Sequence, residues 1–100
     1  MSLKGNVMLQ GGLSTGHCFT PVNLTTRTIN VLIEGRPPGI LGDQYVGAHN
    51  CGDKFHPPGT AVTRQKTVLA NGSPIHLEGD SVSCGDFAAG PPSQRVIVGG

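Results

Sequence analysis

Short apolar runs bounded by glycine and proline dominate the hydrophobic pattern of this chain. The runs are rich in Val, Ile and Leu, and none has the length of a typical helix. Such β-branched runs between turn residues predict short strands. Two of them, Val31–Pro37 and Val68–Pro74, match at a constant offset of 37 residues, and each leads to a Gly-Asp pair at 42–43 or 79–80. The pattern predicts an all-β chain with an internal repeat.

The repeat predicts two β-hairpins, over residues 26–43 and 63–80. Their turns fall at 34–36 and 70–73, and the second turn contains Asn-Gly. This dipeptide is a strong hairpin signal because both central residues of the turn adopt positive φ.

The two ends of the chain predict a third hairpin that is split between the termini. Residues 95–100 resemble a first strand that stops at its turn, and residues 6–12 resemble a second strand, with Gly12 where the others have Asp. Three quasi-equivalent hairpins would be related by one pseudo-threefold axis. His17, His49 or Cys84 follows soon after each second strand, so the axis would gather these three side chains.

Composition limits the core and excludes several classes of protein. The 100 residues include 16 Gly and 8 Pro but no Trp, one Tyr and three Phe, so we expect a thin core. The Gly and Pro content would also suit a disordered chain, but the repeats favour a folded one. A net charge of +1 without a basic stripe argues against nucleic acid. No apolar run approaches the roughly 20 residues that span a bilayer, and we expect no signal peptide.

Cysteine and histidine carry the candidate chemistry. The three Cys are an odd number and cannot all pair within the chain, and four His accompany them. Zn²⁺ prefers four tetrahedral nitrogen and sulfur ligands, and the thiolate favours zinc over iron. The repeat frame and the loop that follows it predict one set of ligands: His17, His49, His56 and Cys84.

Other sulfur and histidine assignments stay open. Cys51 could replace a ligand if its loop curls, Cys18 adjoins His17, and a Cys18–Cys51 disulfide is a further alternative. His76 lies inside a predicted strand and is expected to be structural. A bound metal would also organise the irregular loops 13–25 and 44–62, because a small domain with a thin core needs such a crosslink.

Several stretches of the chain together form a recognisable pattern: 14–19, 31–37 with 42–44, 48–49, His56, 68–74 and Gly-Asp-Ser-Val-Ser-Cys-Gly at 79–85. On these residues, the chain resembles the PAAR-repeat proteins over nearly its whole length. The namesake Pro-Ala-Ala-Arg reads Pro-Pro-Gly-Ile at 37–40 and Pro-Ile-His-Leu at 74–77, so the Arg is absent from both.

The resemblance implies a single small conical domain over residues 1–100, with metal-pinned loops at the apex. It implies a metal bound by three His and one Cys, which fall on His17, His49, His56 and Cys84. The implied partner is the C-terminal end of a trimeric β-helical spike, capped by one copy per trimer, with Val31, Ile33, Val68, Ile97 and their neighbours in the apolar base.

The implied function is that of a structural tip that pierces a bacterial envelope. Such a protein would be made in the bacterial cytoplasm and would act in a phage tail baseplate or a type VI secretion system, with transient contact to the target envelope. Two alternatives come from other classes of protein. A small zinc metalloenzyme would need an open metal position and a general base, for which Asp53 is the nearest candidate. A disulfide-linked extracellular binding module would need paired cysteines.

Overall fold

The computed structural model describes residues 4–16, 22–28, 30–46, 49–51, 54–56, 59–83 and 85–98. All the elements assigned in these residues are β-strands of two or three residues. Their bounds are β1 Gly5–Asn6, β2 Leu13–Ser14, β3 Leu24–Thr25, β4 Gln44–Tyr45, β5 His49–Cys51, β6 Lys54–His56, β7 Gly59–Thr60, β8 Leu69–Ala70, β9 Ser73–Pro74, β10 Ala88–Gly90 and β11 Ile97–Val98. The predicted all-β class is confirmed.

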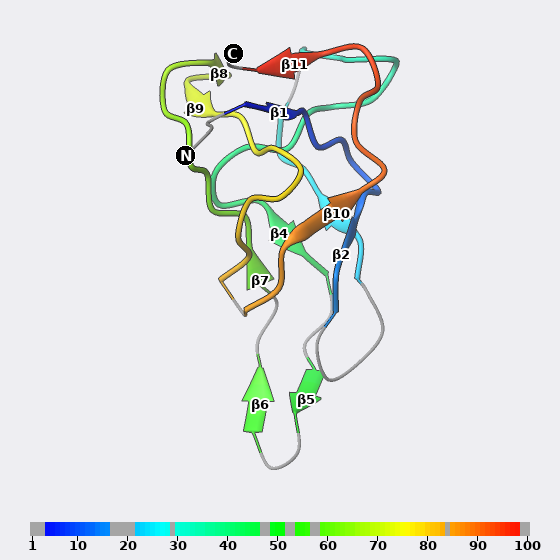
Figure 1. The fold of residues 1–100 in the computed structure, drawn as a ribbon, viewed down its shortest axis with the longest axis vertical. Helices are drawn as coiled ribbons and strands as arrows, with labels where there is room; N and C mark the ends of the chain where they lie inside the picture. Colours follow the sequence, from blue (N-terminus) through cyan, green and yellow to red (C-terminus); the bar gives the residue numbers. More distant parts are fainter. Residues whose placement is uncertain are drawn as a thin grey trace.

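The strands form several small antiparallel sheets. The pairs are β1–β11, β2–β10, β5–β6 and β8–β9, and a three-stranded sheet has the order β3–β4–β7. The molecule measures 40 × 30 × 22 Å along its principal axes. Figure 1 shows β1–β11 and β8–β9 at one end of the long axis and β5–β6 by itself at the other, so the molecule narrows toward β5–β6.

The three predicted hairpins are present at the wide end. At the split hairpin, β1 pairs with β11 in the register Gly5↔Val98. The first hairpin turns at Glu34 and Gly35, with φ of 54° and 81°, and the second turns at Asn71 and Gly72, with φ of 48° and 81°. Two successive positive φ values identify the tight hairpin turn that the sequence predicted.

Below the hairpins, three segments form a closed ring, here called the central triangle (7–9, 38–40 and 75–77). Each segment bridges to both of the others, through Val7↔Leu77, Leu9↔Pro38 and Ile40↔Ile75. The central residues also bond in a cycle: Met8 N donates to His76 O (3.0 Å), His76 N to Gly39 O (2.9 Å), and Gly39 N to Met8 O (2.8 Å). The ring closes on itself, so it satisfies its buried backbone groups without a free edge.

Three equivalent turns follow the central triangle, over residues 9–12, 40–43 and 77–80. Each closes with a hydrogen bond from the amide of its fourth residue to the carbonyl of its first, at 3.0–3.1 Å. The third residue is always glycine, with φ of 90°, 87° and 89°. A type II turn requires positive φ at that position, which explains why glycine recurs there.

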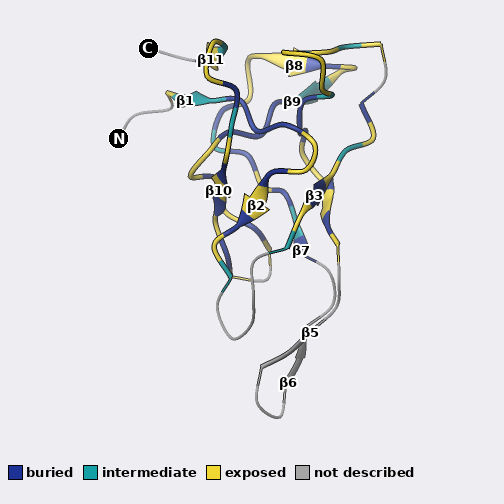
Figure 2. Ribbon diagram, turned by 90° about the vertical axis from the view of Figure 1, so that its right-hand side faces the viewer, coloured by how far each residue is buried: buried dark blue, intermediate teal, exposed yellow. Residues whose placement is uncertain are grey.

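The central triangle separates two hydrophobic clusters. Side chains alternate across an extended segment, so the outer residues of each segment face the hairpins and the central residues face the opposite side. In Figure 2, the buried residues are drawn in dark blue and lie in the body of the molecule, between the hairpin end and the β5–β6 end. The cluster on the hairpin side contains Val7, Leu9, Ile40, Ala70, Ile75, Leu77 and Val98. The cluster on the other side contains Met8, Leu24, Tyr45, Ala61, Val82 and Ala88.

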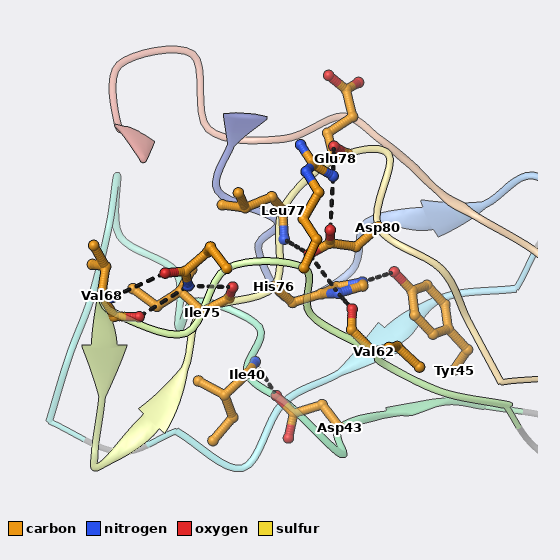
Figure 3. Close-up of polar contacts among 12 residues, drawn as sticks. Ile40, Asp43, Tyr45, Val62, Val68, Ile75, His76, Leu77, Glu78 and Asp80 are labelled. Atoms are coloured by element: carbon orange, nitrogen blue, oxygen red, sulfur yellow. Dashed lines mark hydrogen bonds and ion pairs between the residues drawn. The ribbon is translucent and has the colours of Figure 1, made fainter. Parts of the chain in front are cut away.

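Two of the three turns are held by a buried carboxylate. Asp43 Oδ2 accepts a hydrogen bond from Ile40 N (2.9 Å), and its Oδ1 accepts one from Arg27 Nε (2.9 Å). Asp80 repeats the arrangement with Leu77 N (2.8 Å) and Arg64 Nη1 (2.7 Å). Figure 3 shows both carboxylates aimed at these amides.

The third turn has Gly12 in place of the carboxylate, and the structure gives a steric reason. A Cβ built on Gly12 would lie 2.7 Å from Met8 Cε and 3.1 Å from Leu9 O. A side chain at this position would therefore require the flexible end of Met8 to move.

Candidate metal centre

The four predicted metal ligands lie at the edge of what the structure describes. His17 and Cys84 lie outside the described residues, as does Cys18. His49 and His56 lie in β5 and β6, where the register pairs them directly across the ladder. Among the described residues there is no group of three or more His, Cys, Asp or Glu that could hold a metal ion. The ligand set therefore stays a prediction.

The residues just before His17 lie beside the residues just after Cys84. Thr15 N donates to Phe87 O (2.9 Å), and Phe87 N donates to Thr15 Oγ1 (3.1 Å). Gly16 N donates to the carboxylate Oδ2 of Asp86 (3.1 Å). The structure thus joins two of the predicted ligand segments at their flanks.

A second link joins the Cys84 segment to the chain that leaves β6. Ser83 N donates to Thr60 O (2.9 Å), and Thr60 N donates back to Ser83 Oγ (2.9 Å). Thr60 belongs to β7, which pairs with β4. The segment with His49 and His56 therefore begins after β4 and ends at β7 (Figure 1).

Sequence reasoning did not single out Ser83 or Asp86. Ser83 and Asp86 lie on either side of Cys84, but the repeat frame predicts only His and Cys as ligands. Their partners lie at Thr60 and Gly16, and pairings over such sequence distances leave no local pattern.

His76 occupies the centre of a buried polar network. Its side chain is fully buried, with Nδ1 3.0 Å from Val62 O and Nε2 2.8 Å from the Tyr45 hydroxyl. A carbonyl oxygen can only accept a hydrogen bond, so Nδ1 carries a proton and donates to Val62 O. Figure 3 shows the ring between these two partners. Protein groups thus engage both ring nitrogens, which is the arrangement of a structural histidine.

The network shifts the ionisation of two of its members. Burial raises the pKa of Tyr45, and the charges of Asp80 and Asp86 raise it further, so the hydroxyl keeps its proton. Burial alone would raise the pKa of Asp80. Hydrogen bonding from His76 and the Leu77 amide, with the charges of His76 and Arg64, outweighs burial and holds the pKa of this carboxyl below its ordinary value.

The lowered pKa of Asp80 predicts an acid-dependent loss of stability. The unfolded carboxyl titrates near pH 4, so Asp80 adds stability above about pH 4 and loses it as the pH falls through the lower folded-state pKa. We expect Asp80→Asn to reduce the free energy of unfolding at pH 7 by about 1–3 kcal/mol, and the difference from wild type to shrink below pH 4. Urea unfolding of both proteins from pH 7 to pH 2.5 measures this. A difference that stays constant with pH would contradict it.

The fold defines a class: a small all-β protein of three quasi-equivalent hairpins around a closed backbone ring. The sequence model of the PAAR motif family matches residues 12–86, which is most of the chain. The chain therefore belongs to the PAAR motif family. Comparison with curated proteins finds no significant match. Family membership makes the chain a structural spike-tip protein, associated with the spike complex of a phage or a type VI secretion system.

The described residues contain no helix long and apolar enough to cross a bilayer.

Proposed function

We propose that this single-domain protein caps the distal end of a trimeric β-helical spike, one copy per trimer, and sharpens that spike for piercing a bacterial envelope. The pseudo-threefold symmetry of the wide end carries the proposal. The central triangle pairs its three segments cyclically, so each hairpin stands in an equivalent position on the ring. One copy can then offer similar contacts to three identical partner chains.

Each hairpin at the wide end presents an exposed apolar side chain at the same position of the repeat. These residues, here called the base triad, are Leu32, Leu69 and Ile97, and their relative exposures are 66%, 51% and 48%. The next residue in each hairpin faces the core, because Ile33 packs against the hairpin-side cluster and Ala70 and Val98 belong to it. The triad is thus the outward half of a regular alternation.

The base triad shows which of the expected base residues and their neighbours are most exposed. Val31 and Ile33 pack against the core, so they contribute little to an outer surface. Val68 is 40% exposed and Ile97 is 48% exposed, as a docking surface requires. When these residues dock on the spike, the tip would also cover the open strand edges at the end of the spike.

At the narrow end, we propose that His17, His49, His56 and Cys84 hold Zn²⁺, with iron less favoured. The register of β5 and β6 places His49 opposite His56, and this pairing supports a shared ligand role. The links from Gly16 to Asp86 and from Thr60 to Ser83 support the approach of the other two segments. Three imidazoles and one thiolate suit tetrahedral zinc, which would supply a fixed crosslink between the loops.

The alternatives from other classes receive less support. A zinc enzyme would need an open coordination position and a general base, and Asp53, the nearest candidate, lies outside the described residues. Membership of a spike-tip family favours a structural role. Counting thiols in denaturant separates the tip from a disulfide-linked module, because the tip is expected to show three free thiols and one equivalent of metal.

The location follows from the proposed role. The protein would sit at the tip of the phage baseplate spike in a virion, or leave the cell with a type VI spike, and would touch the target envelope transiently. No nucleic-acid partner is proposed, because the net charge is only +1.

Binding stoichiometry tests the capping role. We expect a soluble fragment that contains the C-terminal end of a trimeric β-helical spike to bind one copy of this protein per trimer. Native mass spectrometry of the complex measures the ratio directly. Three copies per trimer would mean that each spike chain binds its own copy, and would refute a match between the pseudo-threefold base and the trimer.

A further inference from the structure

We propose that Asp86 is a positioning residue of the metal centre, whose buried carboxylate holds the His17 segment against the Cys84 segment. The inference rests on the proposed zinc site and adds to it a residue that is not itself one of the four ligands.

The first observation is the bond that Asp86 makes across the fold. Its side chain is almost fully buried, at 1% relative exposure. Its Oδ2 accepts a hydrogen bond from Gly16 N at 3.1 Å, between residues 70 positions apart. Gly16 directly precedes His17, and Asp86 is the second residue after Cys84. One carboxylate thus fixes the entry of one ligand segment to the exit of another.

The second observation is that Asp86 is itself held firmly. Val82 N donates to Asp86 O (2.8 Å), and Gly85 N donates to Val82 O (2.9 Å). Ser83 is fixed to Thr60 through both its amide and its hydroxyl. The backbone on both sides of Cys84 is therefore anchored, and the carboxylate projects from a well-defined position.

The carboxylate of Asp86 is also a strong hydrogen-bond acceptor, as a positioning residue requires. A buried charge is costly unless it accepts hydrogen bonds, and a charged acceptor binds a backbone amide more strongly than a neutral one. Residues that support metal ligands from outside the coordination sphere typically change metal affinity by about 10–100-fold when they are removed. Asp86 has the location and the bond for such a role.

Asp43 offers a matched control for this proposal. It is also a buried carboxylate that accepts a hydrogen bond from a backbone amide, that of Ile40. Its bonds reach Ile40 within the turn and the backbone and side chain of Arg27, and they do not join two ligand segments. Asp43→Ala should therefore lower stability without a specific effect on the metal.

The experiment compares cobalt(II) binding by the full-length chain and its variants. Affinity is measured by competition with a chromophoric chelator, and coordination is followed by the d–d bands and the thiolate-to-cobalt charge-transfer band. We expect Asp86→Ala to weaken cobalt binding about 10–100-fold and to alter the d–d bands. Asp86→Asn should recover most of the affinity, because its amide oxygen can still accept from Gly16 N. Asp43→Ala should keep the wild-type affinity and spectrum while its melting temperature falls.

Several results would overturn the proposal. Wild-type affinity and spectrum in Asp86→Ala would do so, as would an equal loss in Asp43→Ala. A folded Asp86→Asn as weak as Asp86→Ala would show that charge matters instead of the positioning bond. If Asp86→Ala does not fold, Asp86→Glu, which displaces the carboxylate by one methylene, must show the loss and the altered bands. A wild-type protein without a thiolate-to-cobalt band would refute the metal site itself, which is a separate outcome.

Discussion

Replacing Cys84 with Ser is expected to release the metal and to lower the melting temperature sharply. A serine hydroxyl is a poor zinc ligand at neutral pH, so a four-ligand structural site would lose its one thiolate. Binding of structural zinc to small domains contributes roughly 10–16 kcal/mol of apparent free energy. The two small hydrophobic clusters cannot make up for the loss of this free energy. Elemental analysis and thermal unfolding, with and without a chelator, measure both effects.

Three further variants serve as controls for this result. His76→Ala removes a buried histidine outside the proposed set, so it should unfold more easily yet keep one equivalent of metal. Cys18→Ser and Cys51→Ser should also retain the metal. Full metal content in Cys84→Ser would reject Cys84 as a ligand, and loss of metal from either other cysteine variant would assign that cysteine to the site instead.

Changing the base triad to aspartate is expected to abolish binding to the trimeric spike. Burial of an aliphatic side chain contributes about 1.5–3 kcal/mol, and 1.4 kcal/mol corresponds to a tenfold change in Kd. We expect each of Leu32→Asp, Leu69→Asp and Ile97→Asp to weaken binding about tenfold or more, and the triple variant to show no measurable binding. Their exposure predicts little effect on the melting temperature. Calorimetric titration of the spike fragment measures the affinities.

Val62→Asp provides the matched control for the triad. Val62 is 41% exposed, close to Ile97 at 48%, but it lines a cavity on the flank with Arg64 and Phe87. Its variant should bind the spike like wild type. Triad variants that bind normally, together with a Val62 variant that does not, would place the docking surface on the flank and not on the hairpin end.

Much of the fold could be predicted because its signals are local. The turns at 34–35 and 71–72 are marked by residues that tolerate positive φ, and each closes a hairpin between neighbours in the chain. The split hairpin was also predicted, since residues 6–12 and 95–100 repeat the same pattern, and the pairing of β1 with β11 confirms it. The metal ligands, which the repeat frame selected, stay a prediction.

The all-β class, the hairpin turns and the split third hairpin follow from the sequence, because turn residues act locally and the repeat relates equivalent positions. The closure of the three segments into the central triangle, the apolar residues that face outward and the contact that Met8 would make with a side chain at Gly12 follow only from the tertiary structure. The same holds for the bond from Gly16 to Asp86. These features depend on contacts between segments far apart in the chain, and the closure of the whole ring sets their geometry.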